Sequence, residues 1–550
     1  MRKWSYWLKG SLIVVILIGL FSFNTLRDDY FEIARNLDIF ATLFRELNNH
    51  YVDEIDPEDL ISTGIQAMLS SLDPYTTFIP EQSLEDYKTS TTGQYGGIGA
   101  VVSKRNGVNT VIMPYAGFPA HKAGLQIGDQ IIKIDDQDLY NKSTTEISEL
   151  LKGQPNTPIK LTIIRYGHDD EMDIEMNRAT ITIDNISYSG MVNESVGFIR
   201  LSDFTTDAGK EVSAAVNELK KQGARQLVLD LRGNPGGLLD EAIKVANVFI
   251  PKGAEIVNTK GRLASLNEIY KAPSEPVDDQ IPLVVLTSNG TASAAEIVSG
   301  VVQDYDRGVL IGKKTFGKGL VQTTRSLPYD AQLKITSAKY YIPSGRCIQA
   351  IDYSHRNEDG SVGKIPDSLK VAFKTKHGRT VYDGGGIDPD IEVNIEYYSN
   401  LLVNLINQNI IFDYASKYHF EHEQIVSPRE FQLSDSEYLE FVEWTKDKEL
   451  DFSTEMDQAI VKLEGIAKDE KYYEGMESQL EQLKKKVKDV QTTYLMKYQD
   501  EVKFFLKEEI VGRYYLHPGV IEASIDHDPA IQKALSVLSD EGLYKKLLSN

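Results

Sequence analysis

The sequence predicts a multidomain α/β protein, and three features lead to that class. The chain has 550 residues, which is too long for one compact hydrophobic core. Strand and helix patterns alternate from Ile181 to Val393, as they do in layered α/β domains. Short strands with glycine and asparagine turns precede this segment, and helical patterns occupy both ends of the chain. We therefore expect three or four domains.

We expect five segments along the chain, separated where the period of the apolar residues changes. They are a membrane anchor or signal segment at residues 1–26, an N-terminal helical region at 27–92, a β-rich domain at 93–170, an α/β core at 171–398 and a helical C-terminal extension at 399–550.

The first segment has the composition of a membrane anchor. Basic residues precede the uncharged stretch 10–26, which has about the minimum length for a membrane-spanning helix. The basic flank predicts that the rest of the chain is extracytoplasmic, on the periplasmic side in a Gram-negative cell. A cleaved signal peptide is the alternative, although residues 21–24 contain no clear small-x-small cleavage site.

The composition argues against several classes of partner. The formal net charge is −22, and we see no concentrated basic surface of the kind that nucleic acid binding requires. Cys347 is the only cysteine, which excludes an intrachain disulfide and a cysteine-rich zinc site. We expect neither a metal ion nor another cofactor.

The region from Tyr30 to Leu84 is predicted to be helical, with a break at residues 51–57. Pro57 fits the first turn of the second helix. The apolar faces of these helices are as consistent with a cap on the core as with dimerisation, so a homo-oligomer stays an alternative.

Strands are expected next at residues 99–103, 110–113, 130–134 and 159–164, with a helix at 144–151. The loop Gly96-Gly97-Ile98-Gly99 and the stretch 123–129 make this segment resemble a PDZ domain. In such a domain an extended peptide pairs with a sheet edge, while the glycine-rich loop binds the terminal carboxylate. The resemblance therefore implies that Gly96, Gly97, Ile98 and Gly99 bind peptide; a plain tight turn is the alternative.

The α/β core is predicted to contain strands at 196–201, 226–231, 283–287 and 308–311 and helices at 208–221 and 238–248. The glycine-rich stretch 232–237 follows the second strand and opens a helix, but it lacks the spacing of a dinucleotide loop. Its backbone N–H groups are suited to stabilising an oxyanion, and a plain strand-to-helix turn is the alternative.

Ser293 and Lys318 are the candidate nucleophile and base. Ser293 follows the third strand at a predicted helix start, where the N–H of Ala294 has no helical partner and is able to join Gly237 in an oxyanion hole. No histidine occurs between His168 and His355, which leaves Lys318 as the obvious local base. By itself this pair does not outweigh the alternative of a helix-capping serine and an exposed loop lysine.

A lysine acts as a base near neutral pH only where burial disfavours its charged form. Phe316 and Leu320 flank Lys318 and are expected to provide that apolar setting. Gln322, four residues after the lysine, is expected to orient its amine by a hydrogen bond.

Several motifs in order make the chain resemble the C-terminal processing peptidases, tail-specific serine proteases with a Ser-Lys dyad and an inserted PDZ domain. The matching motifs are the PDZ loop, Leu72-Asp73-Pro74-Tyr75, residues 230–237, the serine and lysine stretches and residues 386–390. The resemblance implies a crotonase-like layered α/β core, with Ser293 as nucleophile, Lys318 as general base and Gln322 as the orienting residue. It implies Gly237 and Ala294 as the oxyanion hole, with Gly236 as the alternative to Gly237.

The resemblance further implies substrates that are proteins or peptides with accessible C-termini, captured by the PDZ domain. Members of the family often have an arginine where this chain has Lys152, which puts coupling between peptide binding and activation in doubt. The competing functions are a crotonase-type acyl-thioester enzyme and a catalytically inactive PDZ scaffold at the membrane.

The C-terminal extension is predicted to be helical and has no recognisable catalytic motif. A heptad seam runs through Met476, Leu480, Leu483, Val487, Val490 and Tyr494. This seam is expected to pack against the protease, and a coiled-coil partner is the alternative.

Overall fold

A computed structural model describes residues 30–549 apart from 169, 358, 395–397, 447 and 449–454. The chain forms two compact units, residues 1–78 and 79–550. The candidate membrane anchor at 10–26 lies outside the described residues. Within the described ranges, no helix is both long and apolar enough to cross a bilayer.

The first unit contains a helix at residues 30–50 and helix α2 (Pro57–Ser70). Asp56 caps α2 by accepting hydrogen bonds from the N–H groups of the next two non-proline residues, and Pro57 lies in the first turn. The predicted break between the helices is confirmed, but residues 71–83 are not α-helical as expected, because Asp73 accepts the N–H groups of Tyr75 and Thr76 in a turn and Thr77–Ile79 form strand β1. Phe31 and Leu37 of the first helix are 68% and 63% exposed, and a capping or pairing role for that helix stays a prediction.

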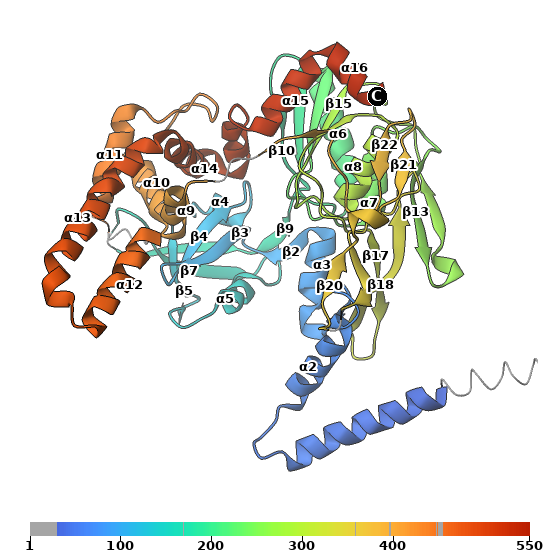
Figure 1. Ribbon diagram of the computed structural model, residues 1–550, viewed down its shortest axis with the longest axis horizontal. Coiled ribbons are helices and arrows are strands. Elements are labelled where there is room, and N and C mark those ends of the chain that lie inside the picture. Colours follow the sequence, from blue (N-terminus) through green and yellow to red (C-terminus); the bar gives the residue numbers. More distant parts are fainter. Residues whose placement is uncertain are drawn as a thin grey trace, which may run out of the picture. The chain divides into compact units, whose positions relative to one another are not determined.

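The β-rich domain is an antiparallel six-stranded sheet with the short helix α4 (Pro119–Lys122) and the longer helix α5 (Thr144–Leu151) (Figure 1). Its strands are β3 (Ala100–Arg105), β4 (Val108–Pro114), β5 (Gln130–Ile134), β6 (Gln137–Asp138), β7 (Pro158–Ile164) and β8 (Met172–Asn177). Ile147 and Leu151 of α5 pack with Leu161 in its core. The predicted strands and helix are confirmed, with ends that differ by at most two residues. Strand β2 (Gln94–Gly97) pairs with β9 (Ala179–Thr182) where the chain enters and leaves this domain.

The α/β core is built on a second six-stranded sheet, in the order β10-β11-β12-β15-β16-β23. These strands are β10 (Ile186–Met191), β11 (Val196–Leu201), β12 (Gln226–Asp230), β15 (Leu283–Thr287), β16 (Val309–Gly312) and β23 (Ile391–Glu392). All neighbours from β11 onward are parallel, and β10 is antiparallel to β11. A separate antiparallel sheet includes β13 (Glu255–Gly261), β14 (Glu268–Lys271), β17 (Leu320–Ser326) and β18 (Gln332–Tyr341). In the sequence, β13 and β14 follow β12, and β17 and β18 follow β16.

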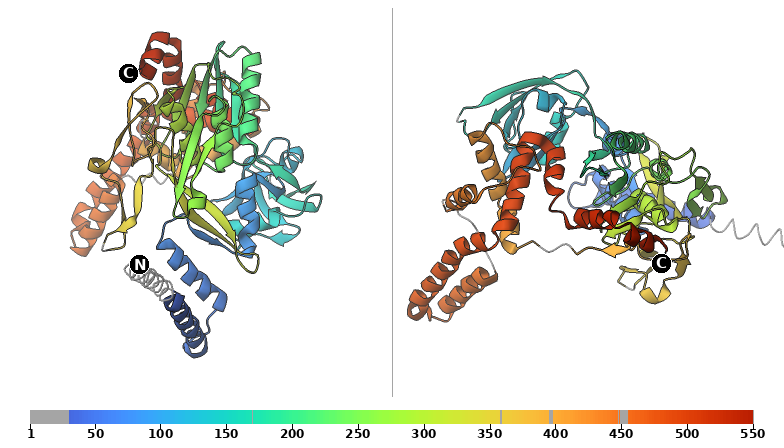
Figure 2. Two further views of the ribbon diagram at one scale, coloured as in Figure 1. Left: turned by 90° about the vertical axis from the view of Figure 1, so that its right-hand side faces the viewer. Right: turned by 90° about the horizontal axis from the view of Figure 1, so that it is seen from above.

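Both faces of the parallel sheet are covered, as such sheets require. Helices α6 (Ala208–Lys221), α7 (Leu239–Asn247) and α8 (Ala294–Asp304) contribute to the core on one face, together with Ile199, Leu229 and Val285. Phe198 and Val228 point to the opposite face and pack against Ile531 and Ala534 of α15 (Pro529–Ser539). Figures 1 and 2 show α15 and α16 (Glu541–Ser549) against the strands. The end of the chain therefore completes the core of the α/β domain.

The rest of the C-terminal region is helical, as predicted. It contains α9 (Asn400–Asn407), α10 (Ile410–Glu421), α11 (Asp435–Thr445), α12 (Glu455–Asp469), α13 (Tyr473–Lys497) and α14 (Gln499–Ser524). Helix α13 packs against α12 and α14. Of the predicted seam, Leu480 is buried, whereas Leu483 and Tyr494 are largely exposed. Among the described residues, the helix that contains the seam therefore packs within the helical domain and not on the protease core as expected. A coiled-coil partner, the alternative, stays a prediction.

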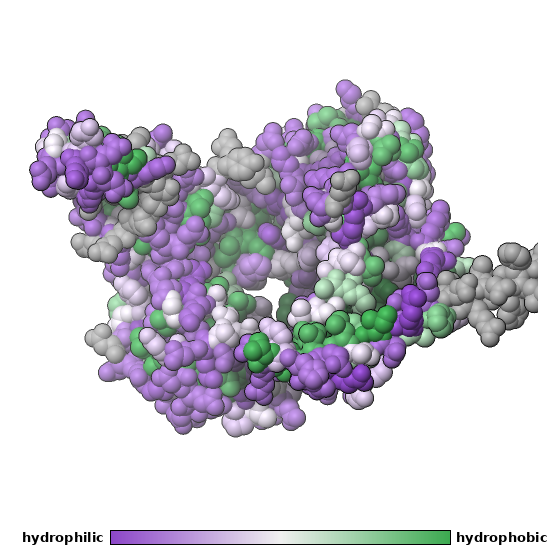
Figure 3. All heavy atoms as spheres, turned by 60° about the horizontal axis from the view of Figure 1, so that its bottom comes forward, coloured by the Kyte–Doolittle hydropathy of each residue, from purple (hydrophilic) through white to green (hydrophobic). Residues whose placement is uncertain are grey.

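This C-terminal region also contacts the β-rich domain. The guanidinium of Arg105 lies 4.0 Å from the centroid of the Phe412 ring of α10. The Phe420 ring meets the ring of Tyr166 edge-on at 6.1 Å between centroids. On the face of the molecule in Figure 3, hydrophilic residues predominate.

Candidate active site

Two strand-to-helix turns meet at one edge of the parallel sheet. They follow the neighbouring strands β12 and β15, whose carboxyl ends lie side by side. The N–H of Ala292 donates to the carbonyl of Asn234 at 2.9 Å, and the N–H of Gly233 donates to Ser288 Oγ at 3.0 Å. These hydrogen bonds join the glycine-rich turn to the turn that contains Ser293.

Ser293 lies at the N-cap of α8 in an unusual backbone conformation. Its φ is 55° and its ψ is −115°, which is a strained combination for a residue with a side chain. Such a conformation costs about 1–3 kcal/mol and persists only where the surroundings fix it. The serine is thus held at the tip of a sharp turn, as a nucleophile requires.

Glu296 fixes the backbone on both sides of the site. Its carboxylate accepts hydrogen bonds from the N–H of Ser293 at 2.9 Å and from the N–H of Lys318 at 2.8 Å. The hydroxyl of Thr315 and the N–H of Gly317 donate to it at 2.5 and 2.7 Å. Glu296 is 0% exposed, and burial raises its pKa to about 7.

Tyr340 of β18 bridges the same two residues from the other side. Its hydroxyl lies 2.6 Å from the carbonyl oxygen of Lys318 and 3.1 Å from that of Ser293. The side chain is 1% exposed. No role in the site was predicted from the sequence for Tyr340 or Glu296. The spacing Ser293-x-x-Glu296 was a usable signal for the glutamate, whereas nothing in the sequence indicated the tyrosine.

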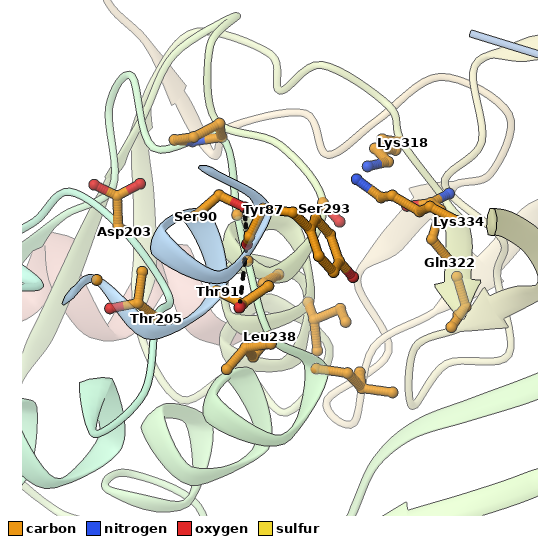
Figure 4. A pocket seen from close by; sticks show the side chains of 18 of the residues that line it. Tyr87, Ser90, Thr91, Asp203, Thr205, Leu238, Ser293, Lys318, Gln322 and Lys334 are labelled. Carbon is orange, nitrogen blue, oxygen red and sulfur yellow. Dashed lines mark hydrogen bonds between the residues drawn. The ribbon is translucent and has the colours of Figure 1, made fainter. Parts of the chain in front are cut away.

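A cavity of about 520 Å³ opens beside this pair (Figure 4). The residues that line it include all five predicted catalytic and oxyanion residues, Gly237, Ser293, Ala294, Lys318 and Gln322. No histidine is among its described lining residues. The structure therefore brings together the residues predicted from the sequence, and their catalytic roles stay predictions.

The apolar setting of Lys318 differs from the expectation. Leu320 is 6% exposed and lines the cavity, but Phe316 is 49% exposed. Phe316 therefore does not bury the lysine, because the chain at Gly317 turns back into the core with a φ of 88° while the phenyl ring stays outside. Leu320, Ile297 and Val321 provide the apolar part of the wall instead.

Two backbone N–H groups in the cavity are suited to an oxyanion. Among the described residues, no acceptor takes the N–H of Gly237 or that of Ala294. The N–H of Gly236 donates to the side chain of Asn234 at 2.8 Å. This arrangement favours Gly237 over Gly236 as the second donor. Gly237 has a φ of 150°, and a Cβ at this position would lie 2.3 Å from the carbonyl oxygen of Phe204, so only glycine fits.

Gln322 and Lys334 lie on the wall of the cavity next to Lys318, and Asp203 lies at the other end (Figure 4). The amide of Gln322 donates to Thr336 Oγ1 at 3.4 Å, which is a long hydrogen bond. Burial raises the pKa of Asp203. The cavity therefore has two lysine side chains at one end and a carboxyl group at the other.

The β-rich domain has a small groove of about 90 Å³ between β3 and α5. Of the four predicted peptide-binding residues, Ile98 lines this groove, whereas Gly96 and Gly97 are paired with β9 and Gly99 begins the turn into β3 with a φ of 75°. Lys152 lines the groove too, and its Nζ lies 2.5 Å from Asp86 Oδ1. The peptide-binding roles of Gly96, Gly97, Ile98 and Gly99 stay predictions.

The same groove is connected to the catalytic cavity through one helix. Asp86 belongs to α3 (Leu84–Thr92), and Tyr87, Ser90 and Thr91 of this helix line the cavity. The Tyr87 hydroxyl is 2.5 Å from Thr324 Oγ1 of β17. Lys152 therefore connects the groove to the cavity through its ion pair with Asp86 of α3.

Comparison with known proteins shows the family to which the chain belongs. Models of peptidase family S41, of a PDZ domain and of the C-terminal helical domain of a probable PDZ-protease match residues 195–355, 111–165 and 401–538. The chain is 36% identical to the carboxy-terminal-processing protease of Bartonella bacilliformis over 64% of this chain and 81% of that protein. It is 35% identical to carboxy-terminal processing protease CtpA of Bacillus subtilis over 60% of this chain and 69% of that protein.

A solved structure of a photosystem II D1 C-terminal processing protease is 26% identical, with 64% of this chain and 92% of that chain covered and a TM-score of 0.34. The identities and coverage of the two bacterial relatives establish the family. The chain is a serine peptidase of family S41 and belongs to the carboxy-terminal processing proteases, with a PDZ domain and a helical C-terminal domain.

Proposed function

We propose that this protein is an endopeptidase that cleaves C-terminal segments of extracytoplasmic proteins by a Ser-Lys acyl-enzyme mechanism. The observation that supports it best is the joint fixation of Ser293 and Lys318 by Glu296, beside two N–H groups that have no acceptor among the described residues. A nucleophile, a base and an oxyanion site are thereby combined in one cavity.

In the first half of the reaction, neutral Lys318 takes the proton of Ser293 Oγ, and the oxygen attacks the carbonyl carbon of the scissile peptide. The N–H groups of Gly237 and Ala294 stabilise the oxyanion of the tetrahedral intermediate. Lys318 then gives its proton to the leaving amine as the C–N bond breaks. In the second half, Lys318 takes a proton from water, whose oxygen attacks the acyl carbon, and then gives that proton to Ser293 Oγ as the ester C–O bond breaks. Gln322 orients the lysine amine throughout.

Substrate selection is proposed to begin at the PDZ domain. The groove between β3 and α5 accepts an extended C-terminal segment beside β3, with residues 96–99 supplying N–H groups for the terminal carboxylate. The names of the bacterial relatives describe processing at the carboxy terminus, in line with such capture. We further propose that residues 10–26 anchor the protein in the membrane with residues 27–550 outside, and that the α/β core is crotonase-like.

The test compares full-length wild type, Ser293→Ala, Lys318→Ala and Ser361→Ala on an internally quenched peptide with a free apolar C-terminus. Ser361 is an exposed loop serine far along the chain and serves as the control. Hydrolysis is expected to fall at least about 10³-fold in the first two variants and to be unchanged in the third. Full activity of a folded Ser293→Ala protein would exclude the mechanism, and absence of hydrolysis by wild type would favour a PDZ scaffold.

A further inference from the structure

Arg232 lies at the base of the glycine-rich turn and is bound by carboxylates from two regions of the chain. Its Nε and Nη2 donate to the two oxygens of Asp230, at 2.9 and 2.7 Å. Its Nη1 donates to Asp528 Oδ2 at 2.7 Å. Asp528 belongs to the C-terminal helical domain, for which the sequence predicts no function.

The geometry of Asp528 is fixed by the helix that it begins. Its Oδ1 accepts hydrogen bonds from the N–H groups of Ala530 and Ile531 at 2.9 and 3.0 Å, which makes it the N-cap of α15. The second oxygen is thereby aimed at Arg232. The side chains of Arg232 and Asp528 are 16% and 17% exposed, so water screens this ion pair only in part.

Helix α15 is attached to the same strand at its other end. The side-chain amide of Gln226, the first residue of β12, donates to the carbonyl of Leu538 at 2.6 Å. Ile531, Ala534 and Val537 pack on the sheet between these two attachments. The helix therefore lies along β12, with Asp528 at the end of the strand that leads into the glycine-rich turn.

The position of Arg232 bears on the oxyanion site five residues later. The intervening turn is tightly determined, because the Asn234 side chain donates to the carbonyl of Leu201 at 2.8 Å and accepts the N–H of Gly236 at 2.8 Å. A shift of Arg232 is therefore transmitted to Gly237 rather than absorbed by a flexible loop. Oxyanion stabilisation depends on donor placement within a few tenths of an ångström, since these hydrogen bonds form fully only in the transition state.

We infer that Asp528 is a positioning residue for the oxyanion turn, so that docking of α15 on the sheet contributes to catalysis by the protease domain. The inference rests on the proposed Ser-Lys function and adds a residue from the C-terminal helical domain to it. Asp528 does not touch the substrate. It acts through Arg232 on the N–H of Gly237.

The decisive variant is Asp528→Asn in the full-length protein. Asparagine is as good an N-cap as aspartate, so α15 keeps its cap while Arg232 loses a charged acceptor. The matched control is Asp526→Asn, which makes the same change two residues away and removes only the ion pair of Asp526 with Arg429. Rates are measured with the quenched peptide, and active sites are titrated with a covalent serine reagent.

We expect kcat per active site to fall about tenfold in Asp528→Asn, with KM within twofold of wild type and an unchanged melting temperature. A peptide boronate that forms a tetrahedral adduct with Ser293 should bind about tenfold more weakly, because one boron hydroxyl occupies the oxyanion site. A merely structural role would lower the number of titratable sites and leave the boronate Ki of the remaining enzyme unchanged. Asp526→Asn should match wild type in all of these measurements.

The inference is overturned if kcat and the boronate Ki of Asp528→Asn stay within twofold of wild type, if only the titratable fraction falls, or if Asp526→Asn loses as much activity. These outcomes are separate from failure of the proposed function, which Ser293→Ala reports. An active Ser293→Ala protein rejects the mechanism. A dead Ser293→Ala protein with a fully active Asp528→Asn protein rejects only the positioning role.

Discussion

The two turns that form the proposed active site are held by carboxylates of different origin. Glu296 lies three residues after Ser293 and fixes the nucleophile turn from within the same helix. Asp528, which binds Arg232 at the start of the glycine-rich turn, is 296 residues away from it in the chain. The nucleophile turn is thus determined locally, whereas the oxyanion turn depends in part on a distant helical domain.

The two carboxylates also differ in their surroundings. Glu296 is fully buried and accepts hydrogen bonds from four donors, while Asp528 is partly exposed and shares Arg232 with Asp230. Removal of a buried acceptor leaves its donors unpaired at about 1–3 kcal/mol each, whereas a partly exposed ion pair is replaced in part by water. Variants of the nucleophile turn should therefore have larger effects than variants of the distant support.

The largest effect is expected for Gly237→Ala in the glycine-rich turn. The new Cβ would lie 2.3 Å from the Phe204 carbonyl oxygen, so the turn must move and the oxyanion N–H moves with it. We expect kcat to fall about 10²–10³-fold, the loss typical of one missing oxyanion donor. Gly233→Ala is the control, because its Cβ would meet no atom within 4 Å although its φ is 71°. An equal loss in both variants would attribute the effect to backbone strain alone.

Glu296→Gln should have the next largest effect. The amide group places a donor where the carboxylate accepted hydrogen bonds, so Ser293 and Lys318 lose their common anchor. We expect kcat to fall about 30–100-fold, measured on the quenched peptide. Glu241→Gln is a matched control, because Glu241 is 3% exposed and accepts the N–H of Gly209 in α6 but is not among the residues that line the cavity. Unchanged kcat in Glu296→Gln would show that the nucleophile turn holds its shape without this anchor.

The pH dependence of stability provides a separate test of Glu296. Burial raises its pKa from 4.5 to about 7, so between these values the folded protein binds a proton that the unfolded chain has released. The contribution of Glu296 to the free energy of unfolding is therefore fully present below about pH 4.5 and is lost as the pH rises through 7, by about 3 kcal/mol in total. The unfolding free energy of wild type, measured with urea, should be lower at pH 8 than at pH 4.5. In Glu296→Gln this decline should be smaller by about 3 kcal/mol. Equal pH dependence of the two proteins would contradict the raised pKa.

Tyr340→Phe should have an intermediate effect. It removes one hydroxyl that lies within hydrogen-bond distance of the carbonyls of Lys318 and Ser293, but it leaves Glu296 in place. We expect about a tenfold fall in kcat and a loss of about 1–2 kcal/mol in unfolding free energy. Tyr305→Phe removes a comparable bond, from the Tyr305 hydroxyl to the Glu255 carbonyl at 2.8 Å. That control should lose stability but keep kcat, and a fall in its kcat would count against a specific role of Tyr340.

Ser288→Ala should have the smallest effect. Ser288 Oγ accepts the N–H groups of Gly233 and Gly290, at 3.0 and 3.2 Å, and so connects the two turns at a half-exposed position where water is able to replace it. We expect a two- to fivefold fall in kcat with KM unchanged. A loss as large as that of Glu296→Gln would mean that the two turns are more strongly coupled than their separate supports indicate.

Much of the local structure was predictable from the sequence. The strands β5, β11 and β15 and the helices α5 and α6 have the predicted ends, because their apolar residues follow one period and their flanking residues are clear turn or cap signals. Motif order and spacing predicted catalytic roles for Ser293, Lys318 and Gln322, and the structure places all three on the wall of one cavity. Phe316 was expected to bury the lysine and does not, since adjacency in sequence does not specify on which side of a glycine turn a side chain falls.

The sequence by itself determined the layered α/β core, the β-rich domain and the residues that meet at the cavity, because hydrophobic period and turn chemistry are local properties. Only the tertiary structure decided what holds those residues in place. Tyr340 reaches Ser293 from another sheet, and Asp528 reaches Arg232 because α15 covers the second face of the parallel sheet. Such contacts arise from burial of complementary surfaces that are far apart in the chain, and no local sequence pattern predicts which surfaces will meet.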